Sequence, residues 1–346
     1  MSLLTGVGEF FGLDIGTTGL RAVQLTNNPS NKQLLRYGAE VIDQKTSSSD
    51  SKADQQKLAQ SIQQLLSKSG IRTKNVAVGL PSSRVFTSVI DIERLAPADL
   101  EKTINYQADS IIPTPPAESK IDWSLLGDSP LDANKVEILI TSVPNEFAEK
   151  RLDILESIGL NVIAFEPDNL ALARALIRPG TSSPHLIIDV GETSTDIVIT
   201  MKGAPRLTRS VPTGSEALIR AASQNLNIDT AQAQEFVFKF GLIQDKLEGQ
   251  IHQAIISTVD ALVTDISKSI KFFESRYQDS KLERIIMTGA ASTLPEFPLY
   301  VANKFGIEVE IGNAWAGVAY PQERQNELMA VSNNFGVAVG LAERNE

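Results

Sequence analysis

The sequence contains no cysteine and only two histidines, His185 and His252. Disulfides, thiol chemistry and zinc sites built on Cys ligands are therefore excluded, and so is a metal site that needs several His ligands. An excess of positive charge is also missing, because the formal net charge is −10. Nucleic-acid binders normally carry a basic surface, so we expect no nucleic-acid partner.

Long hydrophobic runs are absent as well. No stretch approaches the ~20 apolar residues that a transmembrane helix needs, and no basic region followed by an apolar stretch suggests a signal peptide. The ending VSNNFGVAVGLAERNE lacks a basic amphipathic face. We therefore expect a cytoplasmic protein without direct membrane insertion, so that any membrane association depends on a partner.

The 346 residues predict two domains or one bilobal domain. Near the start, FFGLDIGTTGLRAVQL (10–25) reads as an apolar strand, a turn after Asp14 and a second strand. Gly16 permits close approach of the backbone to an anion, the hydroxyls of Thr17 and Thr18 add donors, and Asp14 could hold a hydrated Mg²⁺. Taken alone, a simple β-hairpin with an aspartate at its turn fits this stretch as well.

The same pattern returns in HLIIDVGETSTDIVITMKG (185–203), half the chain away. The two Asp-x-Gly steps align, and a duplicated lobe is the economical explanation. Both turns would then face one cleft, with Asp14 and Asp189 beside a single metal and with phosphates held by residues 16–19 and 191–195. Gly191, Thr193, Ser194 and Thr195 supply the second turn. The pattern is neither a Walker loop nor a dinucleotide fingerprint, since GxxxxGK[ST] is missing and a strand follows the glycines.

Hydrophobic periodicity and the positions of glycine and proline predict the other helices and strands. Before residue 81 the order strand–strand–strand–helix–strand is readable, with a helix that carries Leu58, Ile62, Leu65 and Leu66 and ends at Ser69-Gly70. Residues 84–95, 121–127 and 135–144 read as strands around a helix that ends before Pro113. A stripe from Ile255 to Tyr277 predicts a long helix facing the core.

These motifs resemble the actin-like ATPase superfamily, whose phosphate-1 and phosphate-2 motifs are hairpins of this kind. Its third signature, an adenosine motif with a strand, a glycine turn and a helix, resembles IIMTGAASTLPEF (285–297), with Gly289 and Ala290 in the turn. Within the superfamily, the stretch LEKTINYQADSIIPTPPAESKIDWSLLG and the ending NNFGVAVGLAER resemble the PilM family of type IV pilus assembly proteins.

The resemblance implies an α/β, actin-like (ribonuclease H-like, duplicated) bilobal fold with an FtsA-type inserted subdomain. Residues 1–80 and 145–180 would form the first lobe, with 325–346 packing back on it. Residues 81–144 would form the inserted, partner-binding subdomain, and 181–324 the second lobe with the phosphate-2 and adenosine motifs.

The resemblance also assigns binding residues. Nucleotide contacts are implied for the following residues: Gly16, Thr17, Thr18, Gly191, Thr193, Thr195, Gly214, Glu235, Lys239, Gly289 and Ala290. Asp14 and Asp189 are implied as metal ligands, and Gly214 would open a helix whose amides face anions. The sequence departs from the family at Gln234 and Val237, which replace a carboxylate and a lysine, and at Ala290 and Glu296, which replace glycines. No catalytic residue is assigned: Asp168 is interpreted as a helix start, and Glu192 is the candidate considered for activating water.

The implied function is that of an ATP- or ADP-binding scaffold with Mg²⁺, active in type IV pilus assembly. PilM proteins bind an N-terminal peptide of the inner-membrane protein PilN in a groove between the first lobe and the inserted subdomain, and the 84–125 stretch should contribute to it. We expect other pilus assembly proteins as partners, recruitment to the inner face of the cytoplasmic membrane, and slow or no ATPase activity. The alternatives are a small-molecule kinase of the superfamily, an FtsA-like filament-forming protein of cell division and a type II secretion relative.

Overall fold

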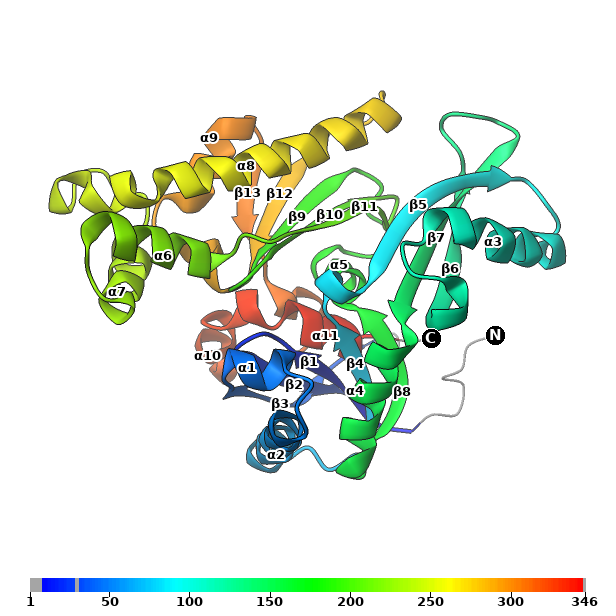
Figure 1. Cartoon of the computed structure of the whole chain (residues 1–346), viewed down its shortest axis with the longest axis horizontal. Helices are drawn as coiled ribbons and strands as arrows, with labels where there is room; N and C mark the ends of the chain where they lie inside the picture. The colour runs from blue at the N-terminus through cyan, green and yellow to red at the C-terminus, as the bar shows by residue number, and fades with distance from the viewer. Residues whose placement is uncertain (1–7, 29–30, 345–346) are drawn as a thin grey trace.

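Two five-stranded sheets with the same internal order form the body of the molecule in this computed structural model, which describes residues 8–28 and 31–344 (Figure 1). The first sheet has the order β3-β2-β1-β4-β8 and the second β11-β10-β9-β12-β13. In each, the central strand (β1 or β9) runs antiparallel to one neighbour and parallel to the other. The duplication predicted from the repeated turns is thus visible in the topology.

The first sheet is covered by helices on its outer side. Its strands are β1 (Phe10–Ile15), β2 (Gly19–Leu25), β3 (Leu34–Val41), β4 (Asn75–Leu80) and β8 (Asn161–Pro167), and its outer helices are α1 (Gln44–Ser48), α2 (Lys52–Ser69) and α4 (Asn145–Ser157). In α2, Leu58, Ile62 and Leu65 are buried, Ser51 caps the start, and Gly70 ends the helix with φ of 71°. The predicted end and the predicted buried face of this helix are confirmed.

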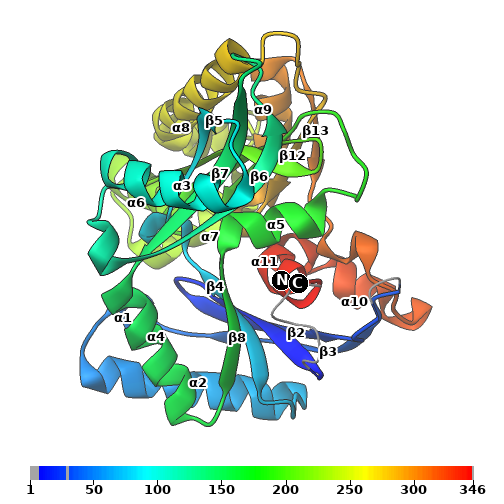
Figure 2. The ribbon, with the colours of Figure 1, turned by 90° about the vertical axis from the view of Figure 1, so that its right-hand side faces the viewer.

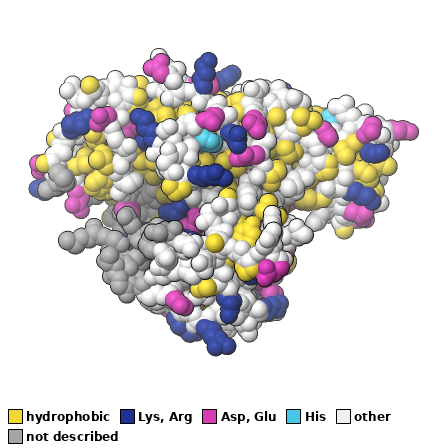
Figure 3. Space-filling view, turned by 180° about the vertical axis from the view of Figure 1, so that it is seen from behind, with side chains coloured by type: hydrophobic (Ala, Val, Ile, Leu, Met, Phe, Trp, Pro, Cys, Tyr) yellow, Lys and Arg dark blue, Asp and Glu magenta, His cyan; other side chains and the backbone are white. Residues whose placement is uncertain are grey.

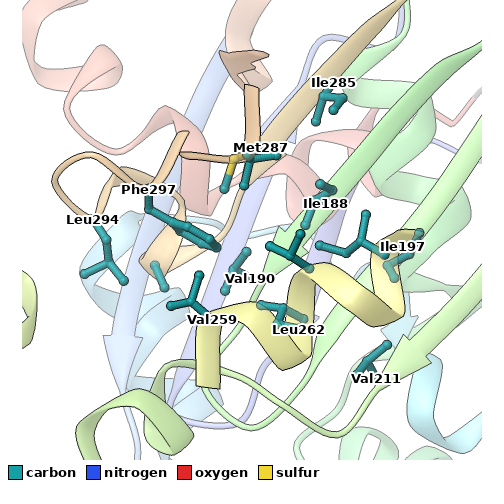
Figure 4. Packing of buried hydrophobic residues seen from close by; sticks show 14 of the residues in the cluster. Ile188, Val190, Ile197, Val211, Val259, Leu262, Ile285, Met287, Leu294 and Phe297 are labelled. Atoms are coloured by element: carbon teal, nitrogen blue, oxygen red, sulfur yellow. The ribbon is translucent and has the colours of Figure 1, made fainter. Parts of the chain in front are cut away.

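The second sheet is also covered by helices on its outer side. Its strands are β9 (His185–Val190), β10 (Thr195–Met201), β11 (Ala204–Val211), β12 (Arg284–Thr288) and β13 (Glu308–Ile311), and its outer helices are α6 (Ser215–Leu226), α7 (Thr230–Phe240), α8 (Gln250–Arg276) and α9 (Phe297–Phe305). Val259 and Leu262 of α8 point toward Ile188, Val190 and Ile197 of the sheet (Figure 4). The stripe predicted for this helix is therefore a core face.

Two helices lie between the sheets and join the halves (Figures 1 and 2). They are α5 (Asp168–Leu176) and α11 (Gly336–Ala342), which contact each other, and the short α10 (Gln325–Met329) precedes α11. α11 packs on β1 and β2, whereas α5 also contacts β10 and β11. A Cβ at Gly340 would lie 1.8 Å from the Ala171 carbonyl oxygen, so only glycine allows this close crossing.

A third, three-stranded antiparallel sheet is inserted between β4 and α4. It has the order β5-β7-β6 and consists of β5 (Phe86–Glu93), β6 (Ser119–Asp128) and β7 (Lys135–Pro144), with α3 (Pro97–Ile111) on one face. Ile104 of α3 is buried against Ile138 and Ile140 of β7. The predicted strands and the predicted helix before Pro113 are confirmed, whereas the boundaries of the lobes and of the partner-binding subdomain stay a prediction.

The inserted sheet is fixed to the second lobe through a buried carboxylate. Glu137 of β7, 2% exposed, accepts hydrogen bonds from Arg276 Nε at 2.9 Å and from the Tyr277 hydroxyl at 2.7 Å. Arg206 of β11 lies 3.3 Å from its other oxygen, and Arg276 also binds Asp91 of β5 at 2.7 Å. β5 accordingly lies beside β11 (Figure 1). The insert is thus connected to the first lobe through the chain but packs against the second lobe.

The surface mixes charges of both signs. On the face seen in Figure 3, Lys and Arg side chains alternate with Asp and Glu over the part of the chain that the structure describes. Within that same part, no helix combines the length and the apolar character that crossing a bilayer requires.

Candidate functional site: an acidic cleft between two turns

The two Asp-x-Gly turns have the same internal geometry. In the first, the Gly16 amide donates to the Gly19 carbonyl at 3.0 Å; in the second, the Gly191 amide donates to the Ser194 carbonyl at 3.0 Å. A Cβ at Gly16 would meet the Gly19 oxygen at 2.9 Å, which is closer than real Cβ atoms come. The aspartate that precedes each turn lies at the end of the central strand of its sheet.

The tips of the two turns meet across the space between the lobes. The hydroxyl oxygens of Thr17 and Thr193 lie 3.4 Å apart, and the Thr18 hydroxyl donates to the carboxylate of Glu192. Both turns line one cavity of about 650 Å³, which is within the usual size of a small-molecule site. The predicted residues in its wall are Asp14, Gly16, Thr17, Thr18, Asp189, Gly191, Thr193, Ser194, Gly289 and Ala290.

The floor of the cavity is acidic. Burial, together with the carboxylates of Asp196 and Asp14, raises the pKa of Asp189 to about 7. Burial also raises the pKa of Asp14, and the Arg21 guanidinium 3.2 Å away opposes that rise. Carboxylates that repel one another at low dielectric bind a cation strongly, because the cation removes the repulsion.

A divalent cation here would need ligands beyond the protein. Among the described residues, no group of three or more His, Asp or Glu side chains is arranged to hold a metal ion. Mg²⁺ suits such a site, because it usually keeps several waters and takes one or two carboxylates plus phosphate oxygens. The donor set of Asp14 and Asp189 therefore fits Mg²⁺ that arrives with a phosphorylated ligand.

The turn after β12 approaches the second aspartate closely. Gly289 has φ of 86°, and a Cβ there would lie 2.5 Å from Asp189 Oδ1. Its amide donates to the Asn333 carbonyl at 2.8 Å. The helix expected directly after this turn is instead a 3-10 turn over Ala290–Thr293, and α9 begins only at Phe297. Glu296, where the family has glycine, adopts φ of 63°, a conformation that glycine takes at no cost.

Gly214 packs closely against the backbone of the second turn. A Cβ at this position would lie 2.3 Å from the Glu192 carbonyl oxygen. The first amides of α6 are already used, since Ser215 donates to the Gly191 carbonyl at 3.0 Å and Glu216 to the Glu192 carbonyl at 2.9 Å. These two amides are therefore not free for an anion, contrary to expectation. Gly214 shapes the turn, and Ser215 lines the cavity in its place.

Three further predicted residues lie outside the cavity wall. Thr195 is fully buried, and its hydroxyl donates to the Thr213 carbonyl at 2.7 Å. Glu235 and Lys239 of α7 are exposed and point elsewhere; Lys239 Nζ lies 5.6 Å from the ring centroid of Phe240. The residues of α7 that do line the cavity are Gln234 and Phe238, one helical turn apart.

Arg21 and Asp168 are residues of the cavity wall that sequence reasoning missed. Arg21 is the cation paired with Asp14. Asp168 does begin α5, as interpreted, but its side chain makes no capping bond, and its Oδ1 is buried without a hydrogen-bond partner. Burial and the carboxylates of Asp14, Asp196 and Asp189 raise its pKa well above the usual range. The signal available in the sequence was that Asp168, like Asp14, is an aspartate at the end of a strand in the first half of the chain.

Comparisons with known proteins agree on family and fold. A family model described as type IV pilus assembly protein PilM matches residues 12–346. A solved PilM-PilN type IV pilus biogenesis complex is 25% identical, with a TM-score of 0.82 and coverage of 98% of each chain.

Two more distant structures share the fold. The ethanolamine utilization protein EutJ from Carboxydothermus hydrogenoformans is 14% identical, with a TM-score of 0.58 and coverage of 97% of this chain and 89% of its own. MreB5 of Spiroplasma citri bound to AMPPNP is 11% identical, with a TM-score of 0.54 and coverage of 96% and 95%. The predicted actin-like ATPase fold is confirmed.

Proposed function

Since the chain belongs to the family of the type IV pilus assembly protein PilM, we propose that it binds ATP or ADP with Mg²⁺ between its two turns. Nucleotide-dependent closure of the lobes would then control its binding to a PilN-type inner-membrane protein. The single observation that carries the nucleotide part is the shared cavity: two turns of equal geometry bring both aspartates to one space.

The residues in the wall divide the proposed nucleotide site into three parts. The backbone and hydroxyls of residues 16–18 and 191–194 hold phosphates, and Arg21 adds a cation on the same side. Asp14 and Asp189 hold the Mg²⁺, which when bound neutralises phosphate charge. Gly289 and Ala290 face the nucleoside, with Gln234 and Phe238 on the opposite helix.

Rapid hydrolysis is not part of the proposal. Glu192 is an unsuitable base, because its carboxylate already accepts the Thr18 hydroxyl across the turns. We propose slow or no ATPase activity, so that bound nucleotide acts as a structural element between the lobes. Closure then follows because one triphosphate contacts both turns and therefore favours the state in which they are close.

The partner is proposed from the relative in the solved PilM-PilN complex, which shares 25% identity over nearly the whole chain. We propose that an N-terminal peptide of a PilN-type protein binds between the first lobe and the inserted subdomain, with contributions from 84–125. Such a contact would recruit this chain to the inner face of the cytoplasmic membrane, where other pilus assembly proteins are further partners. The family match supports this role over a small-molecule kinase, an FtsA-like filament protein or a type II secretion relative.

Calorimetric titration with a synthetic N-terminal peptide of the cognate PilN-type protein tests the proposal. We expect binding, with an affinity that differs severalfold between the nucleotide-free and Mg·ATP-saturated protein. A scrambled peptide is the control. No binding in either state would contradict the partner, whereas equal affinities in both states would contradict the coupling to nucleotide.

A further inference from the structure

The cavity does not end at the two turns but continues into the first lobe. There it is bounded by α1, α4 and the short 3-10 turn Ser82–Arg84 that links β4 to the inserted sheet. The wall of this compartment, which we call the first-lobe compartment, includes Ser47, Ser48, Arg84, Phe147, Lys150 and Arg151, together with Asp50 and Glu146, whose carboxylates pair with Lys150. None of these residues takes part in the nucleotide site described above.

Two guanidinium groups share one aromatic ring in this compartment. Arg151 lies 5.4 Å and Arg84 5.8 Å from the centroid of Phe147. Within residues 8–28 and 31–344, neither arginine forms an ion pair within 4.0 Å, although the Asp50 carboxylate attracts both at longer range. Lys150, next to Arg151 on α4, differs: it pairs with Asp50 at 2.9 Å and with Glu146 at 2.7 Å. Arg84 and Arg151 thus have no direct ion pair among the described residues, whereas Lys150 has two.

Arg151 is the more costly of the two to leave unmatched. It is 7% exposed, and its hydrogen bond from Nη2 to the Ser47 carbonyl is long, at 3.5 Å. Burial lowers its pKa, the carboxylates of Asp168 and Asp50 oppose that change, and Arg84 adds to it. Since the bond to Ser47 is the one hydrogen bond of the Arg151 guanidinium among the described residues, most of its N–H donors are available to a ligand in the cavity, and an anion between the two arginines would accept hydrogen bonds from both groups.

We propose that the first-lobe compartment is an anion site that binds a phosphate group between Arg84 and Arg151. Paired guanidiniums match phosphate, because a fork of parallel N–H donors meets two oxygens at once and two positive charges balance a dianion. The compartment opens into the same cavity as the turns. The phosphate therefore comes either from free orthophosphate or from the terminal group of a nucleotide, and the chemistry of recognition is shared.

An anion in this place would connect the first turn with the base of the insert. The Ser47 hydroxyl donates to the Thr17 carbonyl at 2.7 Å, and the Ser47 carbonyl accepts from Arg151. Arg151 contacts Phe147, and Phe147 contacts Arg84 at the start of the inserted sheet. Occupancy of the compartment thus orders a continuous path from a phosphate-binding turn to the root of the proposed partner-binding subdomain.

The test is titration of the full chain with orthophosphate, without Mg²⁺ or nucleotide and at constant ionic strength, by calorimetry and thermal shift. We expect saturable binding to the wild type. Arg84→Gln, at an exposed position, and Arg151→Gln should each weaken it at least tenfold. Lys150→Gln is the matched control and should bind as the wild type does, because its charge is already paired. Circular dichroism checks that each variant is folded.

Three results would overturn the proposal. The first is that the wild type does not bind phosphate, and the second is that the folded Arg84→Gln variant binds it with wild-type affinity. The third is that Arg21→Gln loses binding while Arg84→Gln retains it, which would place the phosphate at the turns. Repeating the titration at saturating Mg·ADP and Mg·ATP separates the sources. Retained binding with ADP supports free phosphate, whereas competition by ATP alone supports the terminal phosphate. Since the first titration needs no nucleotide, its failure is distinguishable from failure of the proposed nucleotide site.

Discussion

The hydroxyl oxygens of Thr17 and Thr193 lie 3.4 Å apart, although 176 positions separate them in the chain. This contact shows that the two lobes bring their turns together at the mouth of a single cavity. It also means that a phosphate held by both turns must enter between side chains that already touch. In the proposed nucleotide site, entry and release would therefore depend on the distance between the lobes.

Phe238 should determine how well the base is held. Removing its ring in Phe238→Ala should weaken Mg·ATP binding about tenfold, because stacking on an aromatic ring contributes roughly 1–3 kcal/mol per base. Binding of Mg-tripolyphosphate, which has no base, should not change. Calorimetry with both ligands makes the comparison, and Phe272→Ala, which removes an exposed ring of α8, is the control. Equal losses for the two ligands would show that Phe238 acts on something other than the base.

The buried Glu137 should be a large contributor to stability. Glu137→Gln leaves Arg206 without its buried counter-charge and leaves Arg276 with Asp91 alone, so we expect a loss of about 3 kcal/mol in the free energy of unfolding. Urea denaturation measures it. Glu310→Gln, which removes an exposed partner of Arg284, should cost less than about 1 kcal/mol. A similarly small cost for Glu137→Gln would mean that the insert is not fixed to the second lobe by this carboxylate.

Glu343 should make stability depend on pH. Burial raises its pKa to about 7 from an ordinary value of 4.5, although Arg174 and Lys32 oppose the change. Between these two values the folded chain keeps a proton that the unfolded chain has released, so this group lowers stability as the pH rises, and the effect levels off above pH 7.

Glu343→Gln removes that penalty. The free energy of unfolding of the variant, relative to wild type, should increase from pH 5 to pH 8, by about 1.4 kcal/mol for each unit of pKa difference that is realised. Urea denaturation at both values provides the measurement, and the exposed Glu323→Gln should give a difference independent of pH. A flat profile for Glu343→Gln would contradict the burial of a shifted carboxyl.

Much of the fold was predictable because local signals agreed with it. The breakers Ser69-Gly70 and Pro113 and the repeated Asp-x-Gly turns each mark a real boundary, since glycine and proline act on the backbone irrespective of tertiary context. The rotation of α7 was not predictable. Its buried residues Ala233 and Val237 set the helix phase and turn Gln234 and Phe238 toward the cavity, but only the packed structure shows which flank faces it.

Sequence reasoning missed Arg21 and Asp168 for the same reason. Arg21 lies on a strand and Asp168 at a helix start, and both are places where a charged residue is ordinary. What makes them part of the site is the cavity that meets them, formed by segments from both halves of the chain. Thr195 is the opposite case. The motif predicts that its hydroxyl contacts phosphate, but in the structure this hydroxyl donates to a backbone carbonyl.

The central claim is that Asp14 and Asp189 hold one Mg²⁺ with one nucleotide, and a double-mutant cycle tests it most directly. Calorimetry would give the Mg·ATP affinity of the wild type, Asp14→Asn, Asp189→Asn and the double variant. We predict that each single change weakens binding at least tenfold and that the double variant is little weaker than either, since one lost ligand already releases the shared metal. Unchanged affinity in the single variants, or losses that simply add, would contradict the account.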